Sequence, residues 1–202
     1  TLLAESILYT TGALNRLGSI EDGSTTSDYS KDEISRKISI NSSVLNTHWE
    51  DYKLNIIDTP GHTDFTGSVK SSMRIMDTAL IVVNATEGVE VGTEIAVNYA
   101  KEYGIEICFV VNKLDYEKSD LDSAMAQLKE NYGSHVAELQ FPVNQGFGFD
   151  SIVDVLKMKL FKFNPDGKGD YTEHDIPDAL KEKANALHQE LIEMVAEEDE
   201  EL

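Results

Sequence analysis

Residues 105–115 read IEICFVVNKLD, an almost continuous apolar run that ends in polar residues. A second apolar run, TALIVV, covers residues 78–83. Such runs are typical of strands that are buried on both faces of a parallel sheet. Helical patterns at 64–75, 91–103 and 118–132 separate and follow the two runs. This alternation predicts an α/β fold, an open and mostly parallel sheet with helices on both faces.

The segment before these runs has a different pattern. Residues 2–11 are predicted to form a helix, whereas residues 14–36 are polar and without periodicity, as in a functional or mobile loop. Residues 38–46 and 52–58 alternate between apolar and polar side chains. The short link 48–51 between them predicts a β-hairpin.

The segment after residue 141 changes character again. Residues 164–178 are rich in proline, glycine and acids, which is typical of a loop-rich insertion. Residues 178–200 are predicted to form an acidic amphipathic helix. Its expected apolar face comprises Leu180, Ala184, Leu187, Leu191 and Met194.

Composition restricts the function classes. The 202 residues include 17 Lys and Arg against 37 Asp and Glu, so the net charge is 17 − 37 = −20. This charge argues against direct binding of a nucleic-acid backbone, which needs cations. No apolar run approaches the roughly 18–20 residues that cross a bilayer. The one cysteine, Cys108, excludes an internal disulfide framework and suits a reducing compartment, and its strand pattern predicts a buried position.

A first polar cluster, Asp58-Thr59-Pro60-Gly61-His62, directly follows a predicted strand. In open α/β sheets, ligands bind at the carboxyl ends of strands. A carboxylate there can hold a magnesium ion, a glycine lets a backbone N–H approach a phosphate, and a histidine can position a water. The alternative is an ordinary turn, because Asp-x-Pro-Gly is also good turn chemistry.

A second polar cluster, Asn112-Lys113-Leu114-Asp115, ends the other apolar strand. Guanine carries an N1–H and a 2-amino group side by side, and one carboxylate accepts from both. Asp115 suits that role, because adenine would leave it unpaired. The aliphatic stem of Lys113 is able to lie on a base, and Asn112 to tie loops together. The alternative is a polar loop without function.

Together, the two clusters resemble the G domain of the translational GTPases, and most closely the elongation factor G branch. The resemblance runs along the whole chain and includes residues 5–12, 23–28, 58–65 and 112–115. Residues 148–159, GFDSIVDVLKMK, are similar to the entry of the subdomain inserted in the G domain of elongation factor G. The implied division is a GTPase core at 1–140, without the phosphate-binding loop and first strand, and the start of the inserted subdomain at 141–202.

The resemblance implies roles for single residues. Asp58 would hold magnesium through water, the Gly61 amide would sense the γ-phosphate of GTP, and His62 would orient the attacking water. The guanine-specificity motif would be Asn112, Lys113 and Asp115.

Two hydroxyls and one lysine complete the expected site. Ser39 falls where the family has the magnesium-binding threonine of the first switch region, and Thr1 matches the Ser/Thr that ends the phosphate-binding loop. Lys37 replaces a glycine that the family usually has two residues before the switch threonine. Lys37 and Ser39 therefore keep open the alternative of a GTP-dependent switch that does not hydrolyse GTP.

The function implied is GTP hydrolysis by a cytoplasmic, monomeric translation factor that acts on the ribosome and drives translocation. A ribosomal-protection or release-type paralogue is the alternative within the class. The implied partner is the factor-binding site of the large subunit, including its stalk proteins through the acidic helix 178–200. No membrane is implied, and nucleic acid only through the ribosome and other domains. We expect the 202-residue chain alone to bind GTP weakly and to be inactive.

Overall fold

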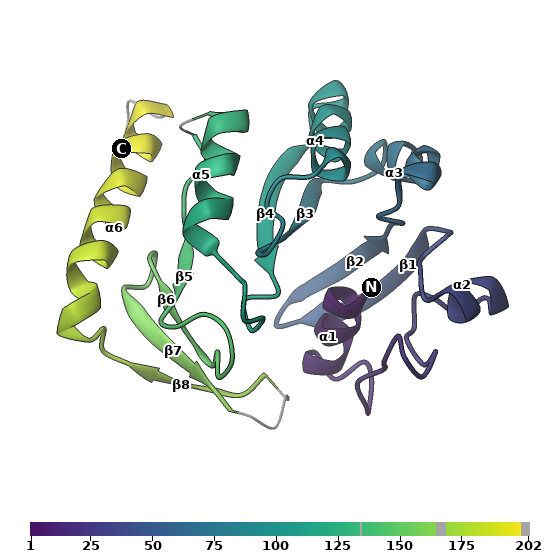
Figure 1. Ribbon diagram of the computed structural model, residues 1–202, viewed down its shortest axis with the longest axis horizontal. Helices are drawn as coiled ribbons and strands as arrows, with labels where there is room; N and C mark the ends of the chain where they lie inside the picture. Colours follow the sequence, from purple (N-terminus) through teal and green to yellow (C-terminus); the bar gives the residue numbers. More distant parts are fainter. Residues whose placement is uncertain (134, 165–168, 199–202) are drawn as a thin grey trace. The chain divides into compact units, whose positions relative to one another are not determined.

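The computed structural model describes residues 1–133, 135–164 and 169–198. The chain begins with two helices and a pair of strands, helices and strands then alternate as far as α5, and four strands and a long helix follow (Figure 1). The helices are α1 (Leu2–Thr10), α2 (Lys31–Arg36), η1 (Thr63–Phe65, a 3-10 helix), α3 (Thr66–Met73), α4 (Val91–Tyr103), α5 (Leu121–Tyr132) and α6 (Asp178–Glu198). The strands are β1 (Ser43–Trp49), β2 (Tyr52–Asp58), β3 (Thr78–Asn84), β4 (Glu106–Asn112), β5 (Gln140–Pro142), β6 (Ser151–Asp154), β7 (Lys159–Phe163) and β8 (Tyr171–His174).

The predicted mixed α/β character is confirmed, but the described strands form three separate sheets. One sheet pairs β1 with β2, a second pairs β3 with β4, and a third has the order β5-β6-β7-β8. The predicted single open sheet is absent from the described residues, because no described strand joins β2 to β3. The third sheet is antiparallel throughout.

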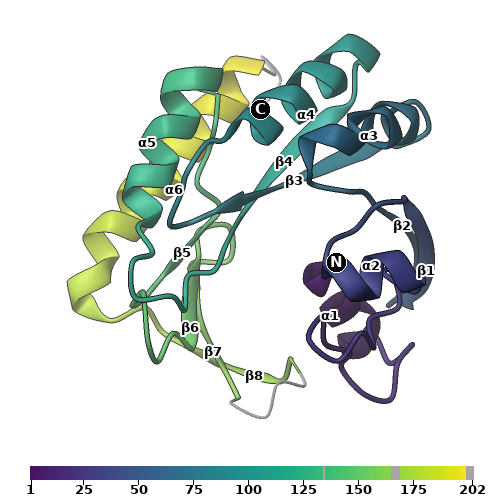
Figure 2. The same cartoon turned by 45° about the vertical axis from the view of Figure 1, so that its right-hand side comes forward.

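The chain divides into two compact units. The first unit comprises Thr1–Ile81 and Val91–Cys108, and the second comprises Val82–Glu90 and Phe109–Leu202. In the first unit, α1 lies beside the β1–β2 hairpin (Figures 1 and 2). A small apolar core explains this arrangement, since the buried side chains of α1 and β1 meet there. Its members are Ala4, Leu8 and Leu45, with Leu14 and Ile56 packed against them.

The predicted hairpin is confirmed, but its first strand begins later than the pattern indicated. Its antiparallel register runs from Ser43 opposite Asp58 to Trp49 opposite Tyr52. The prediction of a strand from residue 38 is wrong, because the Glu33 carboxylate accepts hydrogen bonds from the N–H groups of residues 40 and 41. Those two N–H groups are therefore used by a side chain instead of a strand partner.

Helix α2 lies within the segment 14–36, for which the sequence pattern predicts a loop, although the start of this helix is encoded in the sequence. The Ser30 hydroxyl accepts from the Glu33 N–H at 3.3 Å, and the Glu33 carboxylate accepts from the Ser30 N–H at 3.2 Å. This reciprocal capping box is the S-x-x-E signature of a helix N-terminus. The signature was readable within the polar segment 14–36, which is therefore partly helical.

The second unit has a larger core between the four-stranded sheet and its helices. Helices α5 and α6 lie side by side in both views, and α6 places its predicted apolar face against the sheet (Figures 1 and 2). The buried members are Leu121, Phe141, Val153, Val155, Leu160, Ile176 and Ala184, with Leu180 and Leu187 among the partly buried side chains packed against them. None of the helices within the described ranges is long and apolar enough to span a membrane.

Strand β3 corrects the expectation of strands buried on both faces. Its residues alternate in burial, with Ile81 and Val83 buried, whereas Leu80 is 54% exposed and Val82 is 48% exposed. Neighbouring residues of a strand point to opposite faces, and only one face of β3 is covered. The expectation of a buried Cys108 is also wrong, because this β4 residue is exposed.

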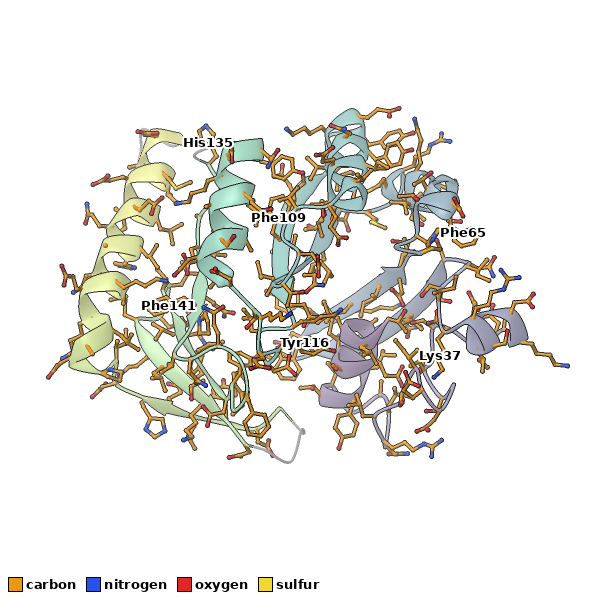
Figure 3. The ribbon with its side chains drawn as sticks, viewed as in Figure 1. Lys37, Phe65, Phe109, Tyr116, His135 and Phe141 are labelled. Carbon is orange, nitrogen blue, oxygen red and sulfur yellow. The ribbon has the colours of Figure 1, made fainter. Side chains whose placement is uncertain are left out.

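Lys183 connects α6 to two other parts of the second unit. Its Nζ lies 3.3 Å from Asp122 Oδ1 on α5 and 3.5 Å from Glu138 Oε1. The same Nζ lies 4.7 Å from the centroid of the Phe141 ring, which is labelled in Figure 3. The Glu138 side chain is only 10% exposed, and burial raises the pKa of its carboxyl despite the nearby lysine.

We predict that Lys183→Met weakens the attachment of α6 by about 1–2 kcal/mol at neutral pH, because it removes the cation that lies 3.5 Å from the buried Glu138 carboxylate. The folded state favours protonated Glu138, so stability falls as pH rises above the carboxyl's ordinary pKa of 4.5. The loss caused by Lys183→Met should therefore be smaller at pH 4 than at pH 7. Amide hydrogen exchange of α6 measures this loss of stability at each pH.

Lys181→Met is the matched control, since Lys181 lies on the same helix and pairs with the exposed Asp178 at 2.7 Å. Its effect should stay within about 0.5 kcal/mol, as for exposed ion pairs. Equal exchange rates for the two variants at pH 7 would contradict the assigned role of Lys183.

Candidate nucleotide site

Asp58 is the last residue of β2, and its side chain is 12% exposed. Its Oδ1 lies 3.1 Å from the backbone nitrogen of Thr1. Its Oδ2 is buried and has no hydrogen-bond partner among the residues that the structure describes. A buried carboxylate oxygen without a partner is costly, and a ligand that uses it would remove that cost.

Two hydroxyls accompany this carboxylate. Thr1 Oγ1 lies 2.8 Å from Ser39 Oγ, so Thr1 contacts both other members of the predicted magnesium site. The first unit therefore brings Thr1, Ser39 and Asp58 together from the start of the chain, the segment before β1 and the end of β2. Hydroxyl and carboxylate oxygens are hard ligands of the kind that Mg²⁺ prefers.

This donor set fits one kind of metal site and not another. The described residues contain no group of three or more His, Cys, Asp or Glu side chains arranged to hold a metal ion. A site with a single carboxylate and two hydroxyls would not hold a cation by protein charge alone. Mg²⁺ is commonly bound in this way, by one or two carboxylates together with phosphate oxygens and water.

Gly61 and His62 follow Asp58 in an exposed loop. A side chain at Gly61 would meet no atom within 4 Å, so the protein's own packing does not require glycine at this position. His62 Nδ1 accepts the backbone N–H of Asp64 at 3.3 Å, and its ring centroid lies 6.0 Å from that of Phe65. The His62 side chain is 55% exposed. Because Nδ1 is an acceptor, this bond favours the tautomer with the proton on Nε2.

The second predicted cluster lies in the second unit, at the end of β4. Lys113 has a left-handed backbone with φ of 65°, and its Nζ lies 5.5 Å from the ring centroid of Tyr116. Tyr116 is labelled beside this loop in Figure 3. Asp115 is exposed and has no hydrogen-bond partner within the described ranges. Its carboxylate is therefore available to a ligand.

Three hydrogen bonds that sequence reasoning missed brace this loop. The carbonyl of Leu114 accepts the N–H of Gly146 at 2.7 Å and the hydroxyl of Ser119 at 3.0 Å. The carbonyl of Asn112 accepts the N–H of Ala85 at 2.9 Å. No local pattern indicates the contacts of Gly146 and Ala85, because these residues lie far from the loop in sequence.

Lys37, the departure from the family pattern, ends α2. Its φ of 56° and ψ of 36° are left-handed, a conformation that costs most residues about 1 kcal/mol and that glycine adopts freely. Its Nζ pairs with the Glu21 carboxylate. At this position, which is labelled in Figure 3, a lysine adopts a backbone conformation that glycine adopts more easily.

Glu33 is the most strongly perturbed acid of the first unit. Burial alone would raise the pKa of its carboxyl, but hydrogen bonds from Asn41, Ser30 and Ile40 outweigh burial and lower the pKa to about 2. The carboxylate is therefore charged at neutral pH.

The comparisons with known proteins agree with this arrangement. Residues 1–199 match the family model described as the elongation factor Tu GTP binding domain. The chain belongs to this family of GTP-binding domains. Over its whole length it is 36% identical to elongation factor G of Thermotoga sp. strain RQ2 and of Fervidobacterium nodosum, and 35% identical to that of Thermotoga maritima. In each case it spans 29% of the relative's length.

A solved structure has the same fold as this chain over nearly its whole length. A crystal structure of a protein from Thermus thermophilus superposes with a TM-score of 0.92 and 30% identity, over 99% of this chain and 30% of the other. The chain is therefore a GTP-binding domain of the translation elongation factor type, related to elongation factor G. It covers less than a third of the curated relatives that it matches.

Proposed function

We propose that this chain is the greater part of the catalytic domain of a ribosome-associated GTPase, which hydrolyses GTP to GDP and phosphate and drives translocation during elongation. The observation that carries the proposal is the junction of Thr1, Ser39 and Asp58, where a buried carboxylate oxygen has no partner within the described residues. In this proposal residues 1–140 belong to the GTPase core and residues 141–202 to the start of an inserted subdomain.

Each half of the site has a distinct task. Thr1, Ser39 and Asp58 would hold Mg²⁺, which when bound would neutralise charge on the phosphates. The Gly61 N–H would donate to the γ-phosphate. His62 would orient the attacking water by donating its Nε2–H to the water oxygen. Asn112 would tie the loops of the site together, while the Lys113 stem covers the guanine and Asp115 accepts its N1–H and 2-amino group.

GTP hydrolysis by the full-length protein, with and without ribosomes, tests the proposal. We expect stimulation by ribosomes of at least about 10²-fold, as transition-state positioning by a partner gives in this class of reaction. GTP binding without stimulation would instead support the switch that does not hydrolyse GTP. Translocation is then separated from ribosomal protection or release by measuring movement of tRNA and mRNA.

Helix α6 offers a contact for the large-subunit stalk proteins. Its exposed face carries Glu182, Glu193 and Glu197, and it also exposes Ile192 and Val195. Acidic groups beside exposed apolar groups suit a partner with a basic and partly apolar surface. The partner would meet this face without disturbing the side chains that attach α6 to its own unit.

We predict that reversing Glu182, Glu193 and Glu197 to lysine lowers ribosome-stimulated turnover by about 3- to 10-fold, mainly through slower association at low salt. Stopped-flow association with ribosomes measures the effect. The control reverses three exposed acids elsewhere, Asp51, Glu106 and Glu130, for the same change in net charge. If both triple variants slow association with ribosomes equally, the effect comes from net charge and not from a contact at α6.

A further inference from the structure

Glu33 is a buried acid whose bonds extend beyond the helix that it caps. It is 1% exposed, and no cation pairs with it among the described residues. Its Oε2 accepts the Ser30 N–H and completes the capping box. Its Oε1 accepts the N–H groups of Ile40 and Asn41, both at 3.0 Å. The capping box needs only one of these oxygens, so the other performs a separate task.

The backbone carbonyl of Glu33 contacts the residues that precede Ser39 in the same segment. Its carbonyl accepts the N–H of Lys37 at the end of α2 and the N–H of Ile38 at 3.3 Å. The two residues before Ser39 and the two after it therefore all donate to Glu33. With both flanks fixed, the Ser39 backbone has little freedom, and its hydroxyl stays 2.8 Å from Thr1 Oγ1.

We propose that Glu33 is the positioning residue of the magnesium site, holding the Ser39 hydroxyl beside Thr1 and Asp58. The inference rests on the proposed function, because it concerns how Ser39 is presented to the cation. Without the carboxylate, the N–H groups of Ile40 and Asn41 lose their acceptor. The segment is then free to turn toward water, and Ser39 Oγ leaves its place.

The test uses Glu33→Met in the full-length protein. Methionine is of similar length but has no carboxylate oxygen, so the N–H groups of Ile40 and Asn41 lose their acceptor. In nucleotide-free protein, the amides of residues 40 and 41 should exchange about 10-fold faster or more, as expected for a lost buried hydrogen bond, while β1 and β2 stay protected. Unchanged exchange at residues 40 and 41 would overturn the inference.

The second readout is the Mg²⁺ concentration that half-maximally slows dissociation of a fluorescent, non-hydrolysable GTP analogue, because the γ-phosphate and its Mg²⁺ are what order a switch segment. Glu33→Met should raise it about 10-fold, the factor expected when one oxygen ligand is misplaced. Ser39→Ala should raise it by a similar factor, and the double variant should behave like Ser39→Ala alone. Additive effects of the two substitutions would contradict action through Ser39.

Ser30→Ala is the matched control. It removes the hydroxyl of the capping box and weakens α2, but it leaves both Oε1 bonds in place. It should not move the Mg²⁺ requirement, and an equal shift would reduce Glu33 to a helix cap. If wild-type protein shows no Mg²⁺ dependence, the proposed function fails; if only Ser39→Ala shifts the dependence, the inference about Glu33 alone fails.

Discussion

Replacement of His62 by alanine is expected to lower ribosome-stimulated GTP hydrolysis by about 10²–10³-fold, the range typical for loss of a group that positions a proton transfer or a water. Affinity for GDP and GTP should change by less than about 3-fold, because the exposed ring takes no part in holding the nucleotide. Single-turnover hydrolysis with saturating ribosomes, together with equilibrium nucleotide binding, separates the two effects.

The structure predicts that different substitutions of His62 lower turnover to different extents. Since Nδ1 of His62 accepts the Asp64 N–H, the proton that would orient the water is on Nε2. Glutamine retains an N–H donor and should therefore lose less activity than alanine. His48→Ala is the control, because His48 is exposed on β1 of the same unit. Equal turnover of His62→Ala and His48→Ala would exclude the assigned role.

Replacement of Asp115 by asparagine should weaken GDP binding by about 10²–10³-fold, because two charge-assisted hydrogen bonds to guanine are lost and an amide NH₂ faces the 2-amino group. The same change should improve binding of xanthosine diphosphate. Xanthine has a carbonyl at the position of the 2-amino group, and the asparagine amide donates to it while accepting the N1–H. Competition between the two nucleotides measures the switch.

A neighbouring acid distinguishes base recognition from local charge. Glu117 is exposed in the same loop, two residues after Asp115, so Glu117→Gln makes the same change in charge without removing the proposed acceptor. It should leave the preference for guanine over xanthine unchanged. A loss of GDP affinity in Asp115→Asn without any gain for xanthosine diphosphate would point to damage to the loop instead of base recognition.

The sequence by itself determined the mixed α/β class, the hairpin, the amphipathic face of α6 and the two polar clusters at strand ends. These features depend on residues close together in the chain, where periodicity and turn chemistry are decisive. It also contains the S-x-x-E signature of α2, within a polar segment that otherwise has the pattern of a loop. Family resemblance alone selected Ser39 and Thr1 as partners of Asp58.

Only the tertiary structure decided which side chains meet. Thr1, Ser39 and Asp58 come together because the α1–hairpin core brings their segments to one place. Glu33 stops the strand before residue 43 by accepting two backbone N–H groups, and Gly146 braces the Asn112–Asp115 loop. The exposure of Leu80 and Cys108 likewise depends on which strand faces are covered. Local pattern fixes an element's type, whereas long-range hydrogen bonds and burial depend on partners that no single segment specifies.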